Sequence, residues 1–270
     1  MLLVVEPGGY VNFIRIMIRV LTLLISPGAH RVSNVLLLLS CFISTQAFAQ
    51  TPSLTFSFDG NWLPYIYKDS SGNVVGKDGA LLKGILARMG YTLNVNVVPE
   101  NRIVSEAVQG RVDVLIGVFK NKEREINNWF SIPYRKENVG IGFLASRAGE
   151  LTCKNFDMHV RNGAIVALNR SAWHGESFDV DYKRNKRFKI IHVEGTQRRL
   201  RMLEKRRADF VVGDVVSIKA TAELLGVTDL ILCDQLIFSD DVYFMFSKQA
   251  VDQSFMATFN RKLTEALKTH

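Results

Sequence analysis

Arg124 has the residue type and position of an anion receptor. It follows a largely apolar run at residues 112–118 and precedes the corner FSIPY at residues 130–134 by six positions. A guanidinium carries a planar fork of donors that matches a carboxylate, so an arginine held near a strand end can bind one. The alternative is a solvated surface charge, which is the usual situation of an arginine.

Other polar and aromatic side chains also follow predicted strands. Because ligands of open α/β sheets lie at the carboxyl ends of strands, these side chains are expected to share one cleft. An aromatic ring, cations, a hydroxyl and a carboxylate together suit a zwitterion. The residues concerned are Trp62, Asn121, Arg124, Arg170, Ser171 and Asp214.

Two of these residues have structural alternatives. Asp214 directly precedes a helical pattern at residues 215–225, where aspartate is a favoured N-cap. Trp62 could belong to the core, but its surroundings, NWLP, are typical of a turn and favour a side chain that faces a ligand.

The elements expected to position these residues form two α/β series. In the first, strands at 54–58, 92–98 and 112–118 alternate with helices at 79–89 and 102–109, which predicts a parallel sheet. In the second series, strands are expected at 164–168, 189–193, 209–212 and 230–233, with helices at 197–206 and 215–225.

Two further stretches, at 138–146 and 240–247, are extended and apolar without internal turn residues. We interpret them as strands that pass between two lobes. A last helix at 251–267 is expected to return to the first lobe.

The N-terminal segment is predicted to be an export signal. Residues 34–49 form an apolar stretch that ends in Ala47-Phe48-Ala49, with Arg31 upstream, which predicts cleavage after Ala49 and a periplasmic location. An earlier apolar stretch at 11–26 is short for a membrane span, so we interpret it as an over-long start.

Composition narrows the class of protein. The chain is 47% hydrophobic and 22% charged, as expected of a folded globular protein, and its net charge of +8 falls to +6 without residues 1–49. The basic runs at 183–187 and 198–201 lack interleaved aromatics, so we interpret them as solvated faces and expect no nucleic-acid partner. Five scattered histidines and the absence of CxxC predict no metal site and no cofactor, whereas Cys153 and Cys233 could pair in an oxidising compartment.

The order of several short motifs resembles the periplasmic solute-binding proteins of family 3, the polar amino-acid receptors of ABC importers. The resemblance covers nearly all of residues 53–268. Its motifs are Pro64-Tyr65, Gly72, Gly76, Asp78, Gly110-Arg111-Val112-Asp113, Glu123-Arg124, FSIPY at 130–134, Arg207-Ala208-Asp209 and Asp214.

The resemblance implies a two-lobed, type II periplasmic-binding-protein fold with two hinge strands between the lobes. Residues 50–141 and 243–270 would form the first lobe, and residues 142–242 the second. It also implies a monomer that closes on a small ligand without chemistry and then docks on a membrane permease.

By the same resemblance, Arg124 would hold the α-carboxylate of the ligand and Asp214 its α-ammonium. Trp62 would cover the ligand from the first lobe, and Ser171 would assist with the carboxylate. Asn121 stands where the family has a threonine.

Two additional cations distinguish this chain. The family pattern places Arg102 at the start of a helix that faces the cleft, and Arg170 stands where the family has a glycine. If both face the cleft, the ligand is more anionic than a neutral amino acid, such as an acidic amino acid or another carboxylate. The alternative is a surface or interlobe salt bridge for each.

Two other classes of function stay open. One is a receptor module that serves a signalling partner. The other is an enzyme on the same scaffold, like periplasmic cyclohexadienyl dehydratase, for which Glu176 or Asp240 could supply the acid. Because the sequence shows no Ser-His-Asp or Cys-His constellation, we expect a binding protein.

Overall fold

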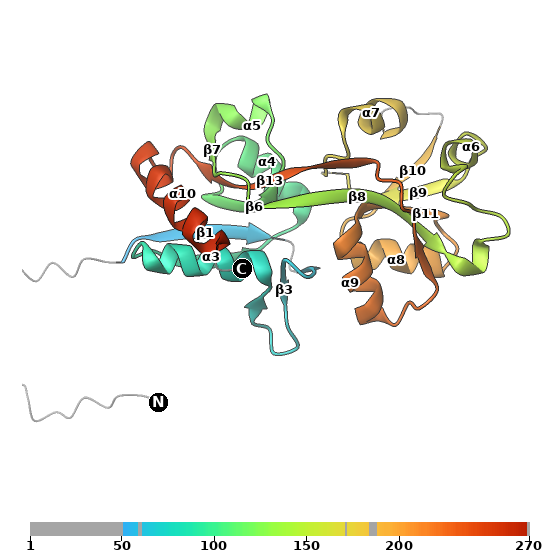
Figure 1. Cartoon of the computed structure of the whole chain (residues 1–270), viewed down its shortest axis with the longest axis horizontal. Helices are drawn as coiled ribbons and strands as arrows, with labels where there is room; N and C mark the ends of the chain where they lie inside the picture. Colours follow the sequence, from blue (N-terminus) through green and yellow to red (C-terminus); the bar gives the residue numbers. More distant parts are fainter. Residues whose placement is uncertain (1–50, 59–60, 171, 184–187, 269–270) are drawn as a thin grey trace, which may run out of the picture. The chain divides into compact units, whose positions relative to one another are not determined.

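The computed structural model describes residues 51–58, 61–170, 172–183 and 188–268. The predicted export signal at 1–49 and the candidate hydroxyl of Ser171 lie outside the described residues. Figure 1 shows the course of the chain, with two groups of helices around strands that run between them.

The first α/β series forms as predicted. Strand β1 (Ser53–Phe58) pairs in parallel with β5 (Thr92–Val97) and with β6 (Val114–Val118). The crossovers are α3 (Lys77–Arg88) and α4 (Glu100–Val108), because a parallel pair needs a long connection between its strands.

The second series repeats this arrangement. Strand β9 (Ile165–Leu168) pairs in parallel with β10 (Lys189–His192) and with β11 (Phe210–Asp214). Helix α8 (Thr196–Glu204) precedes β11, and α9 (Val215–Leu225) follows it without a break.

Two long strands join the series into one sheet. Strand β8 (Arg135–Leu144) pairs antiparallel with β11 and with β12 (Leu230–Leu232), and β13 (Phe238–Ser247) pairs antiparallel with β6. The two strands also pair with each other, so the sheet order is β10-β9-β11-β8-β13-β6-β1-β5. In Figure 1 both strands pass between the two halves, as the sequence predicted.

Several short elements were not predicted, because runs of two to six residues carry too little periodicity to recognise. A small separate sheet, β2-β3-β4, follows β1, and β7 pairs with β13. These elements are β2 (Asn61–Trp62), β3 (Ile66–Lys68), β4 (Val74–Val75), α5 (Lys122–Asn127), β7 (Asn128–Phe130), η1 (Ala145–Arg147), α6 (Phe156–Arg161), α7 (Glu176–Phe178) and η2 (Asp179–Lys183).

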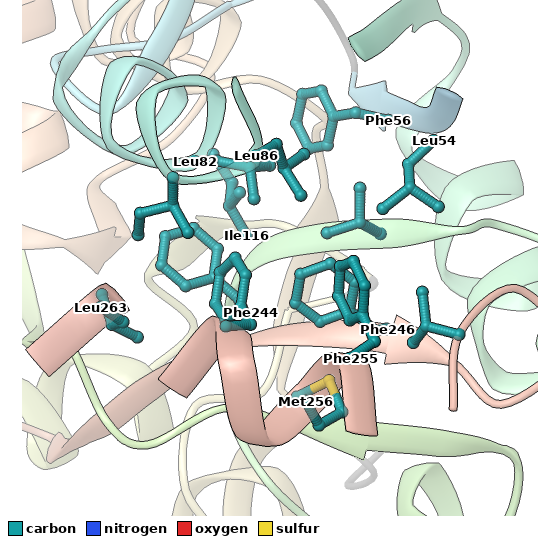
Figure 2. Close-up of a cluster of buried hydrophobic side chains, with 14 of the residues drawn as sticks. Leu54, Phe56, Leu82, Leu86, Ile116, Phe244, Phe246, Phe255, Met256 and Leu263 are labelled. Atoms are coloured by element: carbon teal, nitrogen blue, oxygen red, sulfur yellow. The ribbon is translucent and has the colours of Figure 1, made fainter. Parts of the chain in front are cut away.

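Each half has its own hydrophobic core. In the first, helices α3 and α10 (Gln253–Leu267) pack on the sheet around Leu86, Phe244 and Phe246 (Figure 2). In the second, separate clusters form on either side of β9 and β11. Each α/β series therefore buries its own apolar surface; β13 contributes to both cores, and β8 contributes to the second.

A disulfide joins Cys153 to Cys233 within the second half. The sequence left this pairing open, and the Cα atoms, 5.5 Å apart, lie at the usual separation for a bridge. A disulfide of this kind is typical of proteins that fold in an oxidising compartment.

Candidate functional site

A cavity of about 200 Å³ lies between the two halves. Aromatic and aliphatic side chains of the first half, among them Phe56, Phe58 and Trp62, form much of its wall, and Trp173 contributes from the second half. Charged and polar side chains reach it from both halves: Arg124, Glu137, Asn169, His174, Thr196, Arg199, Asp214 and Ser217.

Arg124 lines this cavity from the first turn of α5. Its backbone N–H donates to Oδ1 of Asn121, the N-cap of the helix, at 2.9 Å. Its Nη1 donates to the carbonyl oxygen of Phe119 at 2.7 Å, which restrains the guanidinium at the end of β6. Burial lowers the pKa of Arg124, opposed by the nearby Glu123 carboxylate, and the side chain stays cationic at neutral pH.

Asp214 lines the cavity from the end of β11 and is only 7% exposed. Its Oδ1 accepts the backbone N–H of Ser217 at 2.6 Å and the hydroxyl of Tyr65 at 3.1 Å. The predicted N-cap of α9 is therefore confirmed. Burial raises the pKa of this carboxyl, although the Ser217 N–H, Arg135 and the Tyr65 hydroxyl favour its charged form.

Trp62 lies on β2 and lines the cavity from the first half. Its ring meets that of Tyr65 edge-on, with centroids 5.0 Å apart. It also lies against Gly117 of β6, where an added Cβ atom would collide with the indole. Because Gly117 has φ of +62°, glycine is required there both for the backbone and for the ring.

The remaining predicted residues lie elsewhere. Arg102, Asn121 and Arg170 have exposed side chains and are not among the residues that line the cavity. Asn121 instead caps α5. The acids considered for an enzyme, Glu176 and Asp240, are likewise exposed and away from the cavity wall.

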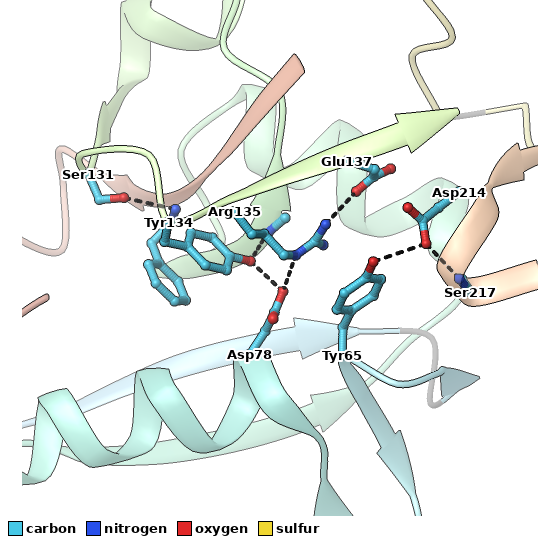
Figure 3. A network of polar contacts seen from close by, with 10 residues as sticks. Tyr65, Asp78, Ser131, Tyr134, Arg135, Glu137, Asp214 and Ser217 are labelled. Carbon is cyan, nitrogen blue, oxygen red and sulfur yellow. Dashed lines mark hydrogen bonds and ion pairs between the residues drawn. The ribbon is translucent and has the colours of Figure 1, made fainter. Parts of the chain in front are cut away.

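A buried polar network beside the cavity was not found by sequence reasoning (Figure 3). Its centre is Arg135, the first residue of β8, whose side chain is 15% exposed. Nε of Arg135 contacts Oδ2 of Asp78 at 2.9 Å, and Nη1 contacts Oε2 of Glu137 at 3.2 Å. The guanidinium also lies 3.6 Å from the centre of the Tyr65 ring, which is close enough for a cation–π contact.

Tyr134 ties this network to β6. Its hydroxyl donates to Oδ2 of Asp78 and accepts the backbone N–H of Gly117 at 2.9 Å. Burial raises the pKa of Asp78, opposed chiefly by Arg135 and by the Tyr134 hydroxyl. Burial also raises the pKa of Tyr134 well above its ordinary value, so this phenol stays protonated.

Glu137, unlike Asp78, also lines the cavity. Burial, followed by the nearby Asp214 carboxylate, raises the pKa of Glu137 to about 8, and Arg135 opposes the change. The sequence did contain a signal for this residue. Arg135, Lys136, Glu137 and Asn138 open a strand that is apolar beyond them, and the period of two sends Arg135 and Glu137 to one face.

Arg199 corrects one interpretation. We read residues 198–201 as a solvated basic face, but Arg199 is 6% exposed and lines the cavity. Its Nη2 donates to Oγ1 of Thr196 at 3.0 Å, and its Nη1 to the carbonyl oxygen of Val193 at 3.2 Å. The helical period of α8 turns Arg199 inward, and Leu200 beside it is fully buried.

Hydrogen bonds between described residues connect the halves across the cavity. The Tyr65 hydroxyl donates to Asp214, and Nδ2 of Asn61 donates to Oε1 of Gln197 at 3.0 Å. Among the described residues, no helix is long and apolar enough to cross a membrane, and no group of three or more histidine, cysteine or acidic side chains could hold a metal ion.

This architecture, two α/β halves joined by two strands around a cavity, defines the class of two-lobed binding proteins of type II. The family model of the bacterial extracellular solute-binding proteins, family 3, matches residues 54–269, and the chain belongs to this family. The predicted family and fold are confirmed. No curated protein matches the chain.

Solved structures share the fold at low sequence identity. A histidine kinase sensor domain with similarity to periplasmic binding proteins has 21% identity and a TM-score of 0.68, covering 80% of this chain and 91% of that one. An ABC uptake transporter substrate binding protein from Streptococcus pneumoniae with bound histidine has 20% identity and a TM-score of 0.67, covering 80% and 87%. The ancestral amino acid-binding protein AncCDT-1, a precursor of cyclohexadienyl dehydratase, has 19% identity and a TM-score of 0.65, covering 80% and 90%.

Proposed function

We propose that this protein captures a small polar ligand, an amino acid or a related carboxylate, by closing its two lobes, and delivers it to the permease of an ABC importer. The observation that supports this best is a cavity with Arg124 on the wall of one lobe and Asp214 on the wall of the other. A ligand that bridges opposite charges from two lobes favours the closed form over the open one.

In this proposal Arg124 grips the carboxylate, assisted by Ser171, and Asp214 holds the ammonium. Trp62 covers the ligand. The positive charges of the exposed Arg102 and Arg170 attract an anionic ligand toward the cleft. Asn121 acts indirectly, by capping the helix that carries Arg124.

The usual energies of hydrogen bonds and ring stacking are sufficient to give such a site a useful affinity. Hydrogen bonds to charged groups contribute about 1.5 to 3 kcal/mol each, so two of them and one stacked ring can reach micromolar affinity, about −8 kcal/mol. The hydrogen bonds between Tyr65 and Asp214 and between Asn61 and Gln197 would add to the stability of the closed form.

We further propose that residues 1–49 are removed on export and that the protein acts in the periplasm as a monomer. Residues 50–141 and 243–270 would move as one lobe and residues 142–242 as the other. The disulfide between Cys153 and Cys233 agrees with an oxidising compartment.

The test is a thermal-shift screen of residues 50–270 against amino acids, dicarboxylates, polyamines and sugars. A ligand at 100 times its Kd stabilises the protein by about 2.7 kcal/mol, which is easily seen. Arg124→Ala is expected to abolish the shift, and Arg88→Ala, an exposed arginine on α3, is expected to retain it. An unchanged shift with Arg124→Ala would contradict the site, and no shift with any compound would contradict the function.

A sensor role is a second candidate, because the histidine kinase sensor domain has the same fold. It predicts the same ligand binding but a different partner. Co-purification with a permease supports import, and co-purification with a kinase contradicts it.

An enzymatic role is favoured by one observation, the buried Glu137 in the cavity wall. A carboxyl with a raised pKa can act as a general acid. Incubation of the purified protein with a cyclohexadienyl carboxylate, with ultraviolet detection of the aromatic product, tests it. Product formation that Glu137→Gln abolishes would replace the binding proposal with a lyase.

A further inference from the structure

Glu137 and Asp214 lie on one face of the central sheet, although 77 positions separate them in the sequence. Asp214 of β11 is the register partner of Val139 on β8, and Glu137 stands two residues from Val139. Partners on paired strands point to the same face, as do residues two apart on one strand. The two carboxyls are therefore diagonal neighbours.

Negative charge exceeds positive charge in this network. Among the described residues of the network, Asp78, Glu137 and Asp214 lie near one guanidinium, that of Arg135 (Figure 3). Arg135 forms ion pairs with Asp78 and Glu137, whereas Asp214 forms no ion pair with it and accepts hydrogen bonds from neutral donors, the Tyr65 hydroxyl and the backbone N–H groups of Ser217 and Asn138. One cation cannot neutralise three buried carboxylates.

Glu137 and Asp214, the two carboxyls of the network that line the cavity, are neutralised less well by Arg135 than Asp78 is. Asp78 and Arg135 are not part of the cavity wall, but Glu137 and Asp214 are. Oδ2 of Asp214 is buried and accepts no hydrogen bond from the described residues. Such an acceptor, more than nine-tenths buried at a cavity wall, is suited to a donor that arrives with a ligand.

The other described charged groups at this cavity have partners elsewhere in the protein. Arg124 and Arg199 line the same cavity, and each donates to a backbone carbonyl of its own lobe. His174 is 1% exposed, with Nδ1 3.5 Å from Oδ1 of Asp179. On β13, the register partner of Glu137 is Asp240, which is exposed.

We propose that Glu137 and Asp214 act together as the receptor for a cationic group of the ligand, an ammonium or a guanidinium. Glu137 is thus a second carboxylate that the ligand must satisfy, and the cleft selects against carboxylates without a positive charge. This inference rests on the proposed function and specifies its ligand class.

The closeness of these two carboxyls also makes ligand binding depend on pH. Without a ligand, the buried pair keeps a proton because two neighbouring carboxylates resist ionisation together, and the pKa of Glu137 is about 8. A bound cation favours the charged form and expels this proton. Affinity is therefore expected to rise with pH until about 8, and binding below that pH releases a proton.

The test compares ligands that differ only in the cationic group. Isothermal titration calorimetry of residues 50–270 is carried out at pH 6 and pH 8 with each L-amino acid of the screen and its 2-hydroxy acid, such as aspartate with malate and phenylalanine with phenyllactate. Agmatine and putrescine supply cations without a carboxylate. Two buffers of different ionisation enthalpy count the protons released.

We expect every compound that binds to carry a cationic group, and its 2-hydroxy counterpart to bind at least about tenfold more weakly. Glu137→Gln keeps the shape and the acceptor for Arg135, and it is expected to weaken the amine about tenfold at pH 8 and to remove proton release. Glu176→Gln, an exposed glutamate of the second lobe, serves as the matched control and is expected to bind like the unmodified protein.

Two results would overturn this inference while leaving the proposed function intact: equal binding of an amino acid and its 2-hydroxy acid, or equal binding by Glu137→Gln and the unmodified protein. Failure of both series to bind at any pH would instead contradict the proposed function.

Discussion

Arg135→Met removes the cation at the centre of the buried network and keeps much of the side-chain volume. The guanidinium is 15% exposed, contacts Asp78 at 2.9 Å and Glu137 at 3.2 Å, and lies against the Tyr65 ring. Both carboxyls lose their ion-pair partner in the variant. We therefore expect destabilisation that depends on the charge of these carboxyls.

Breaking a buried ion pair by removing one partner costs about 3 to 5 kcal/mol. Since a domain has only about 5 to 15 kcal/mol of stability in total, the effect is large. The loss also depends on pH. Without Arg135, the pKa values of Asp78 and Glu137 rise further, so both take up protons in acid and the penalty shrinks. As pH rises, these carboxyls must ionise without a cation, and the gap between variant and unmodified protein widens.

Urea unfolding of residues 50–270 at pH 5 and pH 8, followed by circular dichroism, measures this gap. Arg261→Met is the matched control, because its ion pair with Glu265 on α10 is exposed and such pairs contribute at most about 1 kcal/mol. If Arg135→Met is unfolded at pH 8, the pH 5 data and Arg135→Lys, which keeps the charge, still allow the comparison. A loss no larger than that of the control, or a gap that is the same at both pH values, would refute the reasoning.

Three further outcomes are expected. The midpoint of thermal unfolding of the unliganded protein should fall as pH rises from about 4.5 to about 8, because the folded state holds the Glu137 proton to a higher pH than the unfolded state does. Glu137→Gln should flatten this slope. An equal slope in the variant and the unmodified protein would contradict the raised pKa of Glu137. Gly117→Ala should lower both the unfolding midpoint and ligand affinity, because the added methyl group meets the Trp62 ring and the backbone φ of +62° disfavours alanine. Normal ligand binding by this variant would show that the Trp62 ring is free to move. Reduction of the bridge between Cys153 and Cys233 should destabilise the second lobe by about 2 to 4 kcal/mol in urea unfolding, with the Cys153→Ser variant insensitive to the reductant.

Local patterns determined much of the architecture in advance. Period-two and helical apolar patterns predicted the two α/β series, both hinge strands and the helix at 215–225, whose bounds agree with α9. Arg124 and Asp214 could be selected as site residues because strand ends and helix caps are local features, and both lie on the cavity wall. Whether they bind a ligand stays a prediction.

Local patterns also failed in specific places. Arg102 and Arg170 follow the same rule of strand and helix ends, yet their side chains are exposed. Arg199 lies in a run of cations that reads as surface, yet it is buried. Charge and periodicity give the face on which a residue lies, but not what packs against that face.

Only the tertiary structure decided that Glu137 and Asp214 would be neighbours. Their proximity comes from the antiparallel register of β8 and β11, which pairs Asp214 with Val139. A shift of one residue would send Glu137 to the opposite face relative to Asp214, and nothing local in either strand specifies that register. The sequence determined the strands and their end residues; the packing of two distant segments determined which charges share a cavity, because pairing energy depends on contacts that neither segment makes alone.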